Sequence, residues 1–75
     1  MESNTFTEKV ERFLKYQGLE FTEQDWKARV TVHGVEYLVR RLGNSIWMVS
    51  GSSERTMLYG SDELIEFFYL RVQGR

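Results

Sequence analysis

The chain has 75 residues, with 10 Lys and Arg against 11 Asp and Glu, so its formal net charge is −1. It contains no cysteine and a single histidine, which excludes disulfide bridges and leaves too few ligands for a typical metal site. A chain this short predicts one small domain over residues 1–75, which buries only about 60% of the surface that the unfolded chain exposes.

No targeting leader or membrane span is expected. The N-terminus lacks a basic stretch followed by an apolar run, and no segment approaches the roughly 18 apolar residues of a spanning helix. Residues 1–4 are expected to be frayed. These features predict a cytoplasmic protein without a membrane partner.

The first predicted element is an amphipathic helix. Thr5 and Glu8 fit a capping box that would start it. Gly18 ends it, and Leu19 is placed to fold back onto Leu14 in a Schellman motif. The apolar side recurs at helical spacing and comprises Phe6, Val10, Phe13, Leu14 and Gln17.

Two further segments flank the centre of the chain. Residues 19–25 predict an acidic, irregular link, with Phe21 and Trp26 anchoring its ends in the core. Residues 55–59 alternate well enough to predict a short fourth strand. A hairpin there would put Met57 and Tyr59 on the Val30 side of the sheet, and Thr56 and Leu58 on the other.

The centre of the chain, residues 26–50, predicts three antiparallel strands. His33-Gly34 suits a two-residue turn, because glycine readily adopts the positive φ that such turns need. This turn pairs Val30 with Tyr37 and places Arg29 against Leu38 on the opposite face.

Gly43-Asn44 predicts a second two-residue turn. Because side chains alternate along a strand, this turn places Ile46 and Met48 on the Val30 side of the sheet. Trp47 and Val49 are then expected on the other side.

Residues 61–74 predict a final helix, with Ser61 as its cap and two acids at its positive end. Phe67 and Leu70 lie outside its main apolar arc. Two interpretations stay open. A helix wedged between the sheet and the first helix would bury both residues; otherwise they form a dimer seam or a docking site.

The element order predicts an α+β two-layer sandwich: a helix, three or four antiparallel strands, and a helix. Both helices are expected on one face of the sheet, which carries Val30, Val32, Val39 and Met48.

The second sheet face is expected to be less polar than an open face normally is. By this register it carries Leu38, Trp47, Val49 and Leu58, bordered by Lys27, Arg29, Thr31 and Arg40. Residues 26–59 also contain five bases and two acids. Trp47 stands out, because an exposed indole leaves much apolar surface uncovered. In the alternative interpretation a helix or the 19–25 link covers this face and buries Trp47.

The sequence offers no catalytic constellation. His33 is the only histidine and lies in a predicted turn, so no serine or threonine has a neighbouring base. The loop 51–53 lacks the pattern of a phosphate-binding loop. An enzyme is therefore not expected, and no catalytic, metal-binding or cofactor-binding residue is assigned.

The leftover apolar and basic groups favour a protein-binding module that occludes a partner's surface as an adaptor or inhibitor, of the small kind that phages and mobile elements encode. Trp, Tyr and Arg often dominate interface energy. The candidate partner-binding residues are Trp47, Arg29, Arg40, Leu38 and Lys27 on the sheet, and Phe67 and Leu70 on the last helix. The alternative is weak nucleic-acid binding, with bases on phosphates and Trp47 stacked on a base. A homodimer is compatible with either function.

Overall fold

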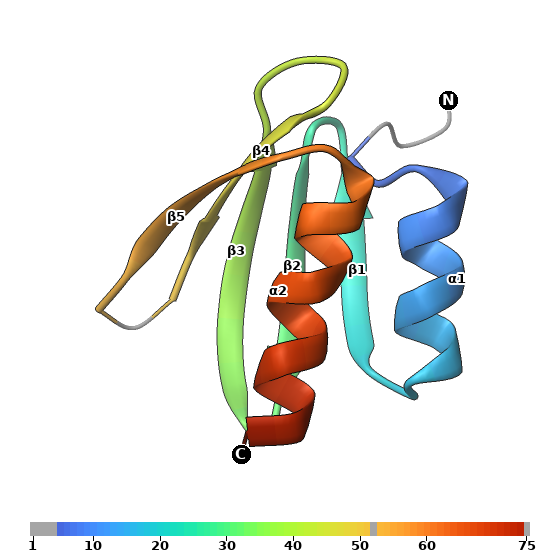
Figure 1. The fold of residues 1–75 in the computed structure, drawn as a ribbon, viewed down its shortest axis with the longest axis vertical. Helices are drawn as coiled ribbons and strands as arrows, with labels where there is room; N and C mark the ends of the chain where they lie inside the picture. Colours follow the sequence, from blue (N-terminus) through green and yellow to red (C-terminus); the bar gives the residue numbers. More distant parts are fainter. Residues whose placement is uncertain (1–4, 52, 75) are drawn as a thin grey trace.

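A computed structural model describes residues 5–51 and 53–74 of the chain. The frayed end predicted for residues 1–4 lies outside the described residues. The elements, in chain order, are α1 (Glu8–Tyr16), β1 (Glu20–Gln24), β2 (Lys27–Val32), β3 (Val35–Arg41), β4 (Ile46–Ser50), β5 (Arg55–Tyr59) and α2 (Ser61–Gly74) (Figure 1).

The five strands form one antiparallel sheet in the order β1-β2-β3-β4-β5, so each strand pairs with its neighbour in sequence. Figure 1 shows α1 and α2 side by side in front of this sheet. The predicted α+β class, with an antiparallel sheet flanked by two helices, is confirmed. The sheet has one strand more than the largest number expected.

The additional strand is β1, in the segment expected to be an irregular link. It folds back on β2 through a two-residue turn at Asp25 and Trp26, and Phe21 pairs with Val30. Trp26 adopts a positive φ of 63° in this turn. Phe21 packs against the core as expected, whereas Trp26 remains 44% exposed and does not anchor the link in the core.

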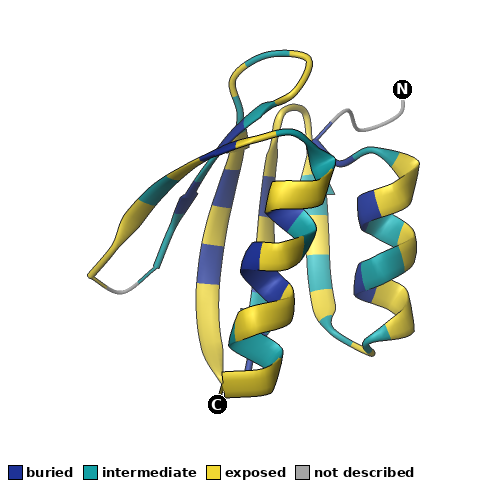
Figure 2. Cartoon of the chain, viewed as in Figure 1, coloured by how far each residue is buried: buried dark blue, intermediate teal, exposed yellow. Residues whose placement is uncertain are grey.

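The hairpin between β2 and β3 has the predicted register. His33 and Gly34 form its turn, with φ of 51° and 80°. Val30 pairs with Tyr37, and Arg29 with Leu38. Figure 2 shows the result on β3, where residues 36–40 alternate between exposed and buried.

The loop between β3 and β4 differs from the prediction. Leu42 donates its N–H to the carbonyl of Ile46 at 2.8 Å, so the loop contains three residues, 43–45, rather than two. Neither Gly43 nor Asn44 has the positive φ that the predicted turn requires. The pairing therefore shifts by one residue, and Arg41 pairs with Trp47.

This shift reverses the two faces of β4, because a one-residue slip turns every side chain to the other side. Trp47 and Val49 are fully buried, at 0% exposure. Ile46 and Met48 are only partly buried and lie on the opposite face. The predicted places of all four residues are wrong for this single reason.

The strand predicted at residues 55–59 exists as β5, and its pairing with β4 is the expected one. Trp47 pairs with Leu58, and Met48 with Met57. Because the side chains of β4 are on the opposite faces from those predicted, the side chains of β5 are too. The predicted faces of Met57, Leu58 and Tyr59 are therefore wrong. Leu58 is buried, whereas Met57 and Tyr59 are 42% and 58% exposed.

Trp47 lies in a core shared by the sheet and both helices. Its indole N–H donates to the carbonyl of Thr5 at 2.7 Å, in the segment that leads into α1. The Arg41 guanidinium lies 5.1 Å from its ring centre. The other fully buried large apolar side chains are Val10, Leu14, Val30, Val32, Val39, Val49, Leu64 and Phe68.

Both ends of α1 have defined caps. The N-cap is Thr7, whose hydroxyl accepts from the N–H of Val10, and not Thr5 as predicted. Thr5 is fully buried, and its hydroxyl oxygen lies 2.5 Å and 2.7 Å from the carbonyl oxygens of Gln24 and Lys27. At the other end Leu19 donates to the carbonyl of Leu14 at 3.1 Å, which confirms the predicted Schellman motif.

Candidate functional site

The strand residues that point away from the helices form a surface that we call the open face. Each has a neighbour along its strand that points into the core, and pairing places the members side by side. Its described members are Glu20, Thr22, Gln24, Lys27, Arg29, Thr31, Glu36, Leu38, Arg40, Ile46, Met48, Ser50, Arg55, Met57 and Tyr59.

One corner of the open face is apolar. Ile46 pairs with Tyr59 on one side and with Leu42 on the other, where β3 ends. In the next row Met48 pairs with Met57. We call these five residues the apolar corner. Leu42, Met57 and Tyr59 are between 42% and 58% exposed, which leaves much of their surface in water.

Four cations lie beside this corner, and we call them the basic band: Lys27, Arg29, Arg40 and Arg55. Lys27 and Arg40 are direct cross-strand partners, an arrangement of like charges that destabilises a sheet. Arg29 reaches Glu36 at 3.9 Å. Within the described residues, the other three cations of the band form no ion pair.

Three cations elsewhere in the described residues form ion pairs. Lys9 lies 2.6 Å from Asp62, and Arg12 lies 3.1 Å from Glu8 on the same helix. Arg71 contacts the carboxylate of Glu54 at 2.9 Å. In the basic band, only Arg29 has an ion-pair partner among the described residues.

The open face carries two shallow hollows. The larger, of about 460 Å³, lies over β1 to β3 and is lined by Thr22, Gln24, Lys27, Ala28, Arg29, Leu38, Val39 and Arg40. The smaller, of about 330 Å³, lies over β3 to β5 and is lined by Leu38, Arg40, Met48, Ser50 and Arg55. Both contain Leu38 and Arg40, and none of these lining residues is acidic.

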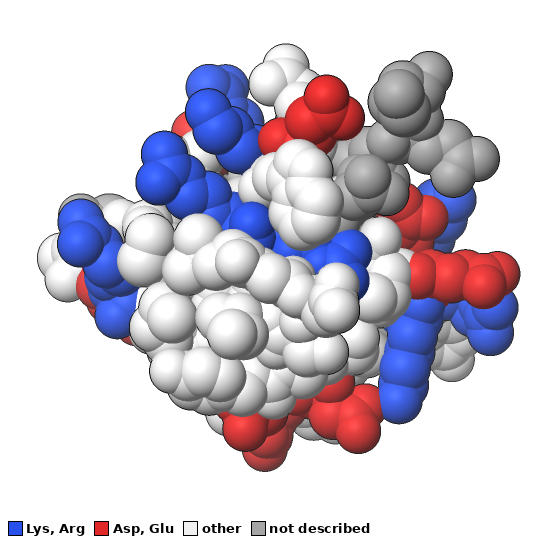
Figure 3. Space-filling model, turned by 90° about the horizontal axis from the view of Figure 1, so that it is seen from above, with Lys and Arg blue, Asp and Glu red and all other residues white. Residues whose placement is uncertain are grey.

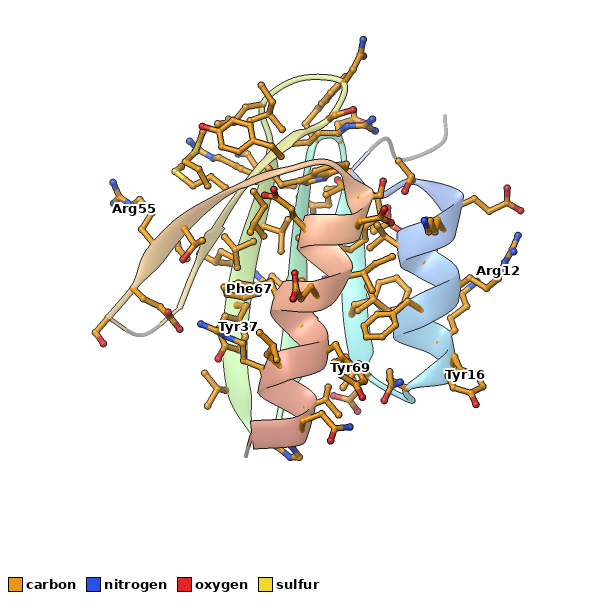
Figure 4. All side chains as sticks on the ribbon, in the orientation of Figure 1. Arg12, Tyr16, Tyr37, Arg55, Phe67 and Tyr69 are labelled. Carbon is orange, nitrogen blue, oxygen red and sulfur yellow. The ribbon has the colours of Figure 1, made fainter. Side chains whose placement is uncertain are left out.

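Figure 3 views the molecule from above and shows a broad uncharged area, with Lys and Arg side chains along its upper left border, Asp and Glu along its lower edge, and side chains of both signs on the right. In Figure 4 Arg55 projects from the tip of β5, on the side of the molecule opposite Arg12 of α1.

The structure brings four of the predicted partner-binding residues together. Lys27, Arg29, Leu38 and Arg40 are all exposed on the open face, and Leu38 is 50% exposed at its centre. Trp47 is a wrong assignment, because the shifted β4 register places it in the core. The alternative interpretation expected Trp47 to be buried, but under a second layer on the open face. The structure buries it on the helix side of the sheet instead.

The two predicted partner-binding residues on the last helix, Phe67 and Leu70, differ in exposure. Phe67 is 6% exposed and packs edge-on against Tyr37, with ring centres 5.8 Å apart (Figure 4). Its ring also lies 3.8 Å from the guanidinium of Arg71, so the sheet and this side chain both cover it. Phe67 is therefore not a docking residue, and only Leu70 remains available, at 52% exposure.

The apolar corner was missed by reasoning from sequence. Residues 46–49 are all apolar, so both alternating sets fit a buried face and the pattern does not choose between them. The size of Trp47 is the one available signal, because burying an indole removes more apolar surface from water than burying Met48.

The described residues contain no group of His, Cys, Asp and Glu that could hold a metal ion. His33 instead places Nε2 at 2.9 Å from the carbonyl oxygen of Val72. No helix in the described ranges is long and apolar enough to cross a membrane. Comparisons with protein-family models, with curated proteins and with solved structures find no match for this chain.

Proposed function

We propose that the protein is a non-catalytic binding module that attaches to another protein through its open face and occludes the surface it covers. The observation that carries this proposal is Leu38, which is half exposed between two hollows and is flanked by Arg29 and Arg40. An adaptor or an inhibitor acts in this way.

The composition of the open face supports a protein partner. Interface cores are enriched in Met, Tyr and Arg and depleted in Lys and acidic side chains. Here Met48, Met57 and Tyr59 lie beside Arg40 and Arg55. Methionine is also flexible enough to fit an irregular apolar surface.

Nucleic acid is the second candidate partner, since the basic band would attract phosphates. Single-strand binding also uses aromatic side chains on which bases stack. Trp47 is buried, and the centre of the open face carries Leu38 and Met48 instead. A protein with its own apolar side chains matches this centre better than a base does.

The experiment compares two leucines of similar exposure on different surfaces. Leu38 is 50% exposed on the sheet and Leu70 is 52% exposed on α2. Wild type, Leu38→Ser and Leu70→Ser are immobilised, and proteins retained from an extract of the source cells are identified by mass spectrometry. Each retained protein is then purified, and its Kd for the three variants is measured by calorimetry.

The proposal expects a direct partner whose Kd rises about ten-fold or more with Leu38→Ser and stays near wild type with Leu70→Ser. A Kd that rises with Leu70→Ser and not with Leu38→Ser would show that the partner binds α2 instead of the open face. Retention that disappears after nuclease treatment would favour the nucleic-acid alternative.

A further inference from the structure

We infer that the partner presents an acidic segment that also carries a large apolar or aromatic side chain. The inference rests on the proposed function and states the chemistry that the open face recognises. It follows from two features of that face, the basic band and the apolar corner, and from their spacing.

The first feature is the like-charged pair in the basic band. Lys27 and Arg40 face each other across two strands, and neither has a carboxylate within ion-pair distance among the described residues. Their repulsion opposes folding of the isolated domain. A carboxylate of the partner placed between them would relieve this repulsion, so the free energy stored in the pair favours an acidic ligand.

The second feature is the apolar corner, which adjoins the band in the same rows. Arg40 pairs directly with Met48, and Met48 with Met57. The row of Ile46 and Tyr59 follows at roughly 7 Å, two residues further along the strands. An acidic side chain over the band and an apolar side chain over the corner would therefore belong to the same short segment.

The start of α2 in a second copy of this chain is a poorer match. The acids at the start of α2 already have partners, because Asp62 contacts Lys9 at 2.6 Å and Glu63 accepts from the N–H of Tyr59 at 2.9 Å. Nucleic acid satisfies the band but supplies no aliphatic or aromatic side chain for the corner. A different protein, with free carboxylates beside an apolar residue, satisfies both features.

A random dodecapeptide library displayed on phage tests this inference without knowledge of the partner. The full chain serves as bait, and the Kd of each selected peptide is measured by fluorescence anisotropy. We expect selected peptides to combine acidic residues with a large apolar residue. Lys27→Glu should weaken their binding about ten-fold or more, because reversing the charge replaces attraction with repulsion.

The matched control is Lys15→Glu, which makes the same charge change at an exposed position of α1 and should leave Kd unchanged. Three results would overturn the inference: no enrichment, selected peptides without acids, or equal weakening by both variants. Neutral apolar peptides that lose binding with Leu38→Ser would overturn the acidic partner while leaving the proposed function intact. A short single-stranded DNA that binds as tightly as the peptides would contradict both.

Discussion

Replacing Trp47 by alanine tests the register on which the location of the open face depends. The indole is fully buried, and truncating such a side chain costs about 3–5 kcal/mol. Its N–H also donates to the carbonyl of Thr5, and leaving that buried acceptor unpaired adds about 1 kcal/mol. A domain of this length has a total stability of roughly 4–11 kcal/mol, so Trp47→Ala is expected to lose a large part of it.

The assay is urea unfolding followed by far-UV circular dichroism, which does not depend on the indole signal. Trp47→Phe is a milder change that retains an aromatic ring but removes the donor, and we expect it to cost about 2 kcal/mol. The matched control is Met48→Ala, the next residue along β4. Met48 is only partly buried on the open face, so its truncation should cost less than about 1 kcal/mol.

A reversed ranking would refute the reasoning. If Met48→Ala destabilised the domain more than Trp47→Ala did, the two-residue turn at Gly43-Asn44 would be correct and Trp47 would lie on the surface. Lys27, Arg29 and Arg40 would keep their places on β2 and β3, but Arg55 and the apolar corner would no longer lie beside them.

Three further changes test individual contacts by the same unfolding measurement. Lys27→Glu replaces the repulsion with Arg40 by a cross-strand ion pair and should stabilise the domain by about 0.5 kcal/mol, a gain that shrinks at high salt; a loss would contradict the charge arrangement. Gly51→Ala places a Cβ 3.0 Å from the ring of Tyr37 and should cost about 1–3 kcal/mol. An unchanged urea midpoint would show that the Tyr37 ring moves aside at little cost. Thr5→Val removes the hydroxyl that bonds to the β1–β2 hairpin and should cost about 1–2 kcal/mol; a neutral result would mean that those carbonyls find other donors.

The charge change at Lys27 has opposite effects on stability and on binding. We expect Lys27→Glu to make the isolated domain more stable and its complex with an acidic segment weaker. A residue with a purely structural role would not separate the two measurements in this way, so the variant gives independent readouts of the fold and of the inferred partner chemistry.

Several elements could be predicted because their signals are local. The Schellman motif needs only Gly18 and its neighbours, and the β2–β3 turn needs only His33-Gly34 with alternation on either side. The register of this hairpin also determines which side chains of β2 and β3 share a face. Lys27, Arg29, Leu38 and Arg40 were therefore assigned to one surface from the sequence, and the structure places them there.

Other features depended on contacts between distant segments. Phe67 lies off the main apolar arc of α2, yet it is buried because Tyr37 of β3 and Arg71 cover its ring. The strand β1 has an acidic, mixed composition, and it forms because Phe21 packs on the core while its main chain pairs with β2. Neither outcome can be read from the periodicity of the segment itself.

The sequence by itself therefore determined the two helices, the β2–β3 hairpin and the shared face of Lys27, Arg29, Leu38 and Arg40. Only the tertiary structure decided which side of β4 and β5 faces the helices. The physical reason is that both alternating sets of β4 are apolar, so local pattern assigns similar energies to either register. Packing under the helices resolves the choice, since burying Trp47 and bonding its N–H to Thr5 outweighs leaving Met48 and Met57 in water.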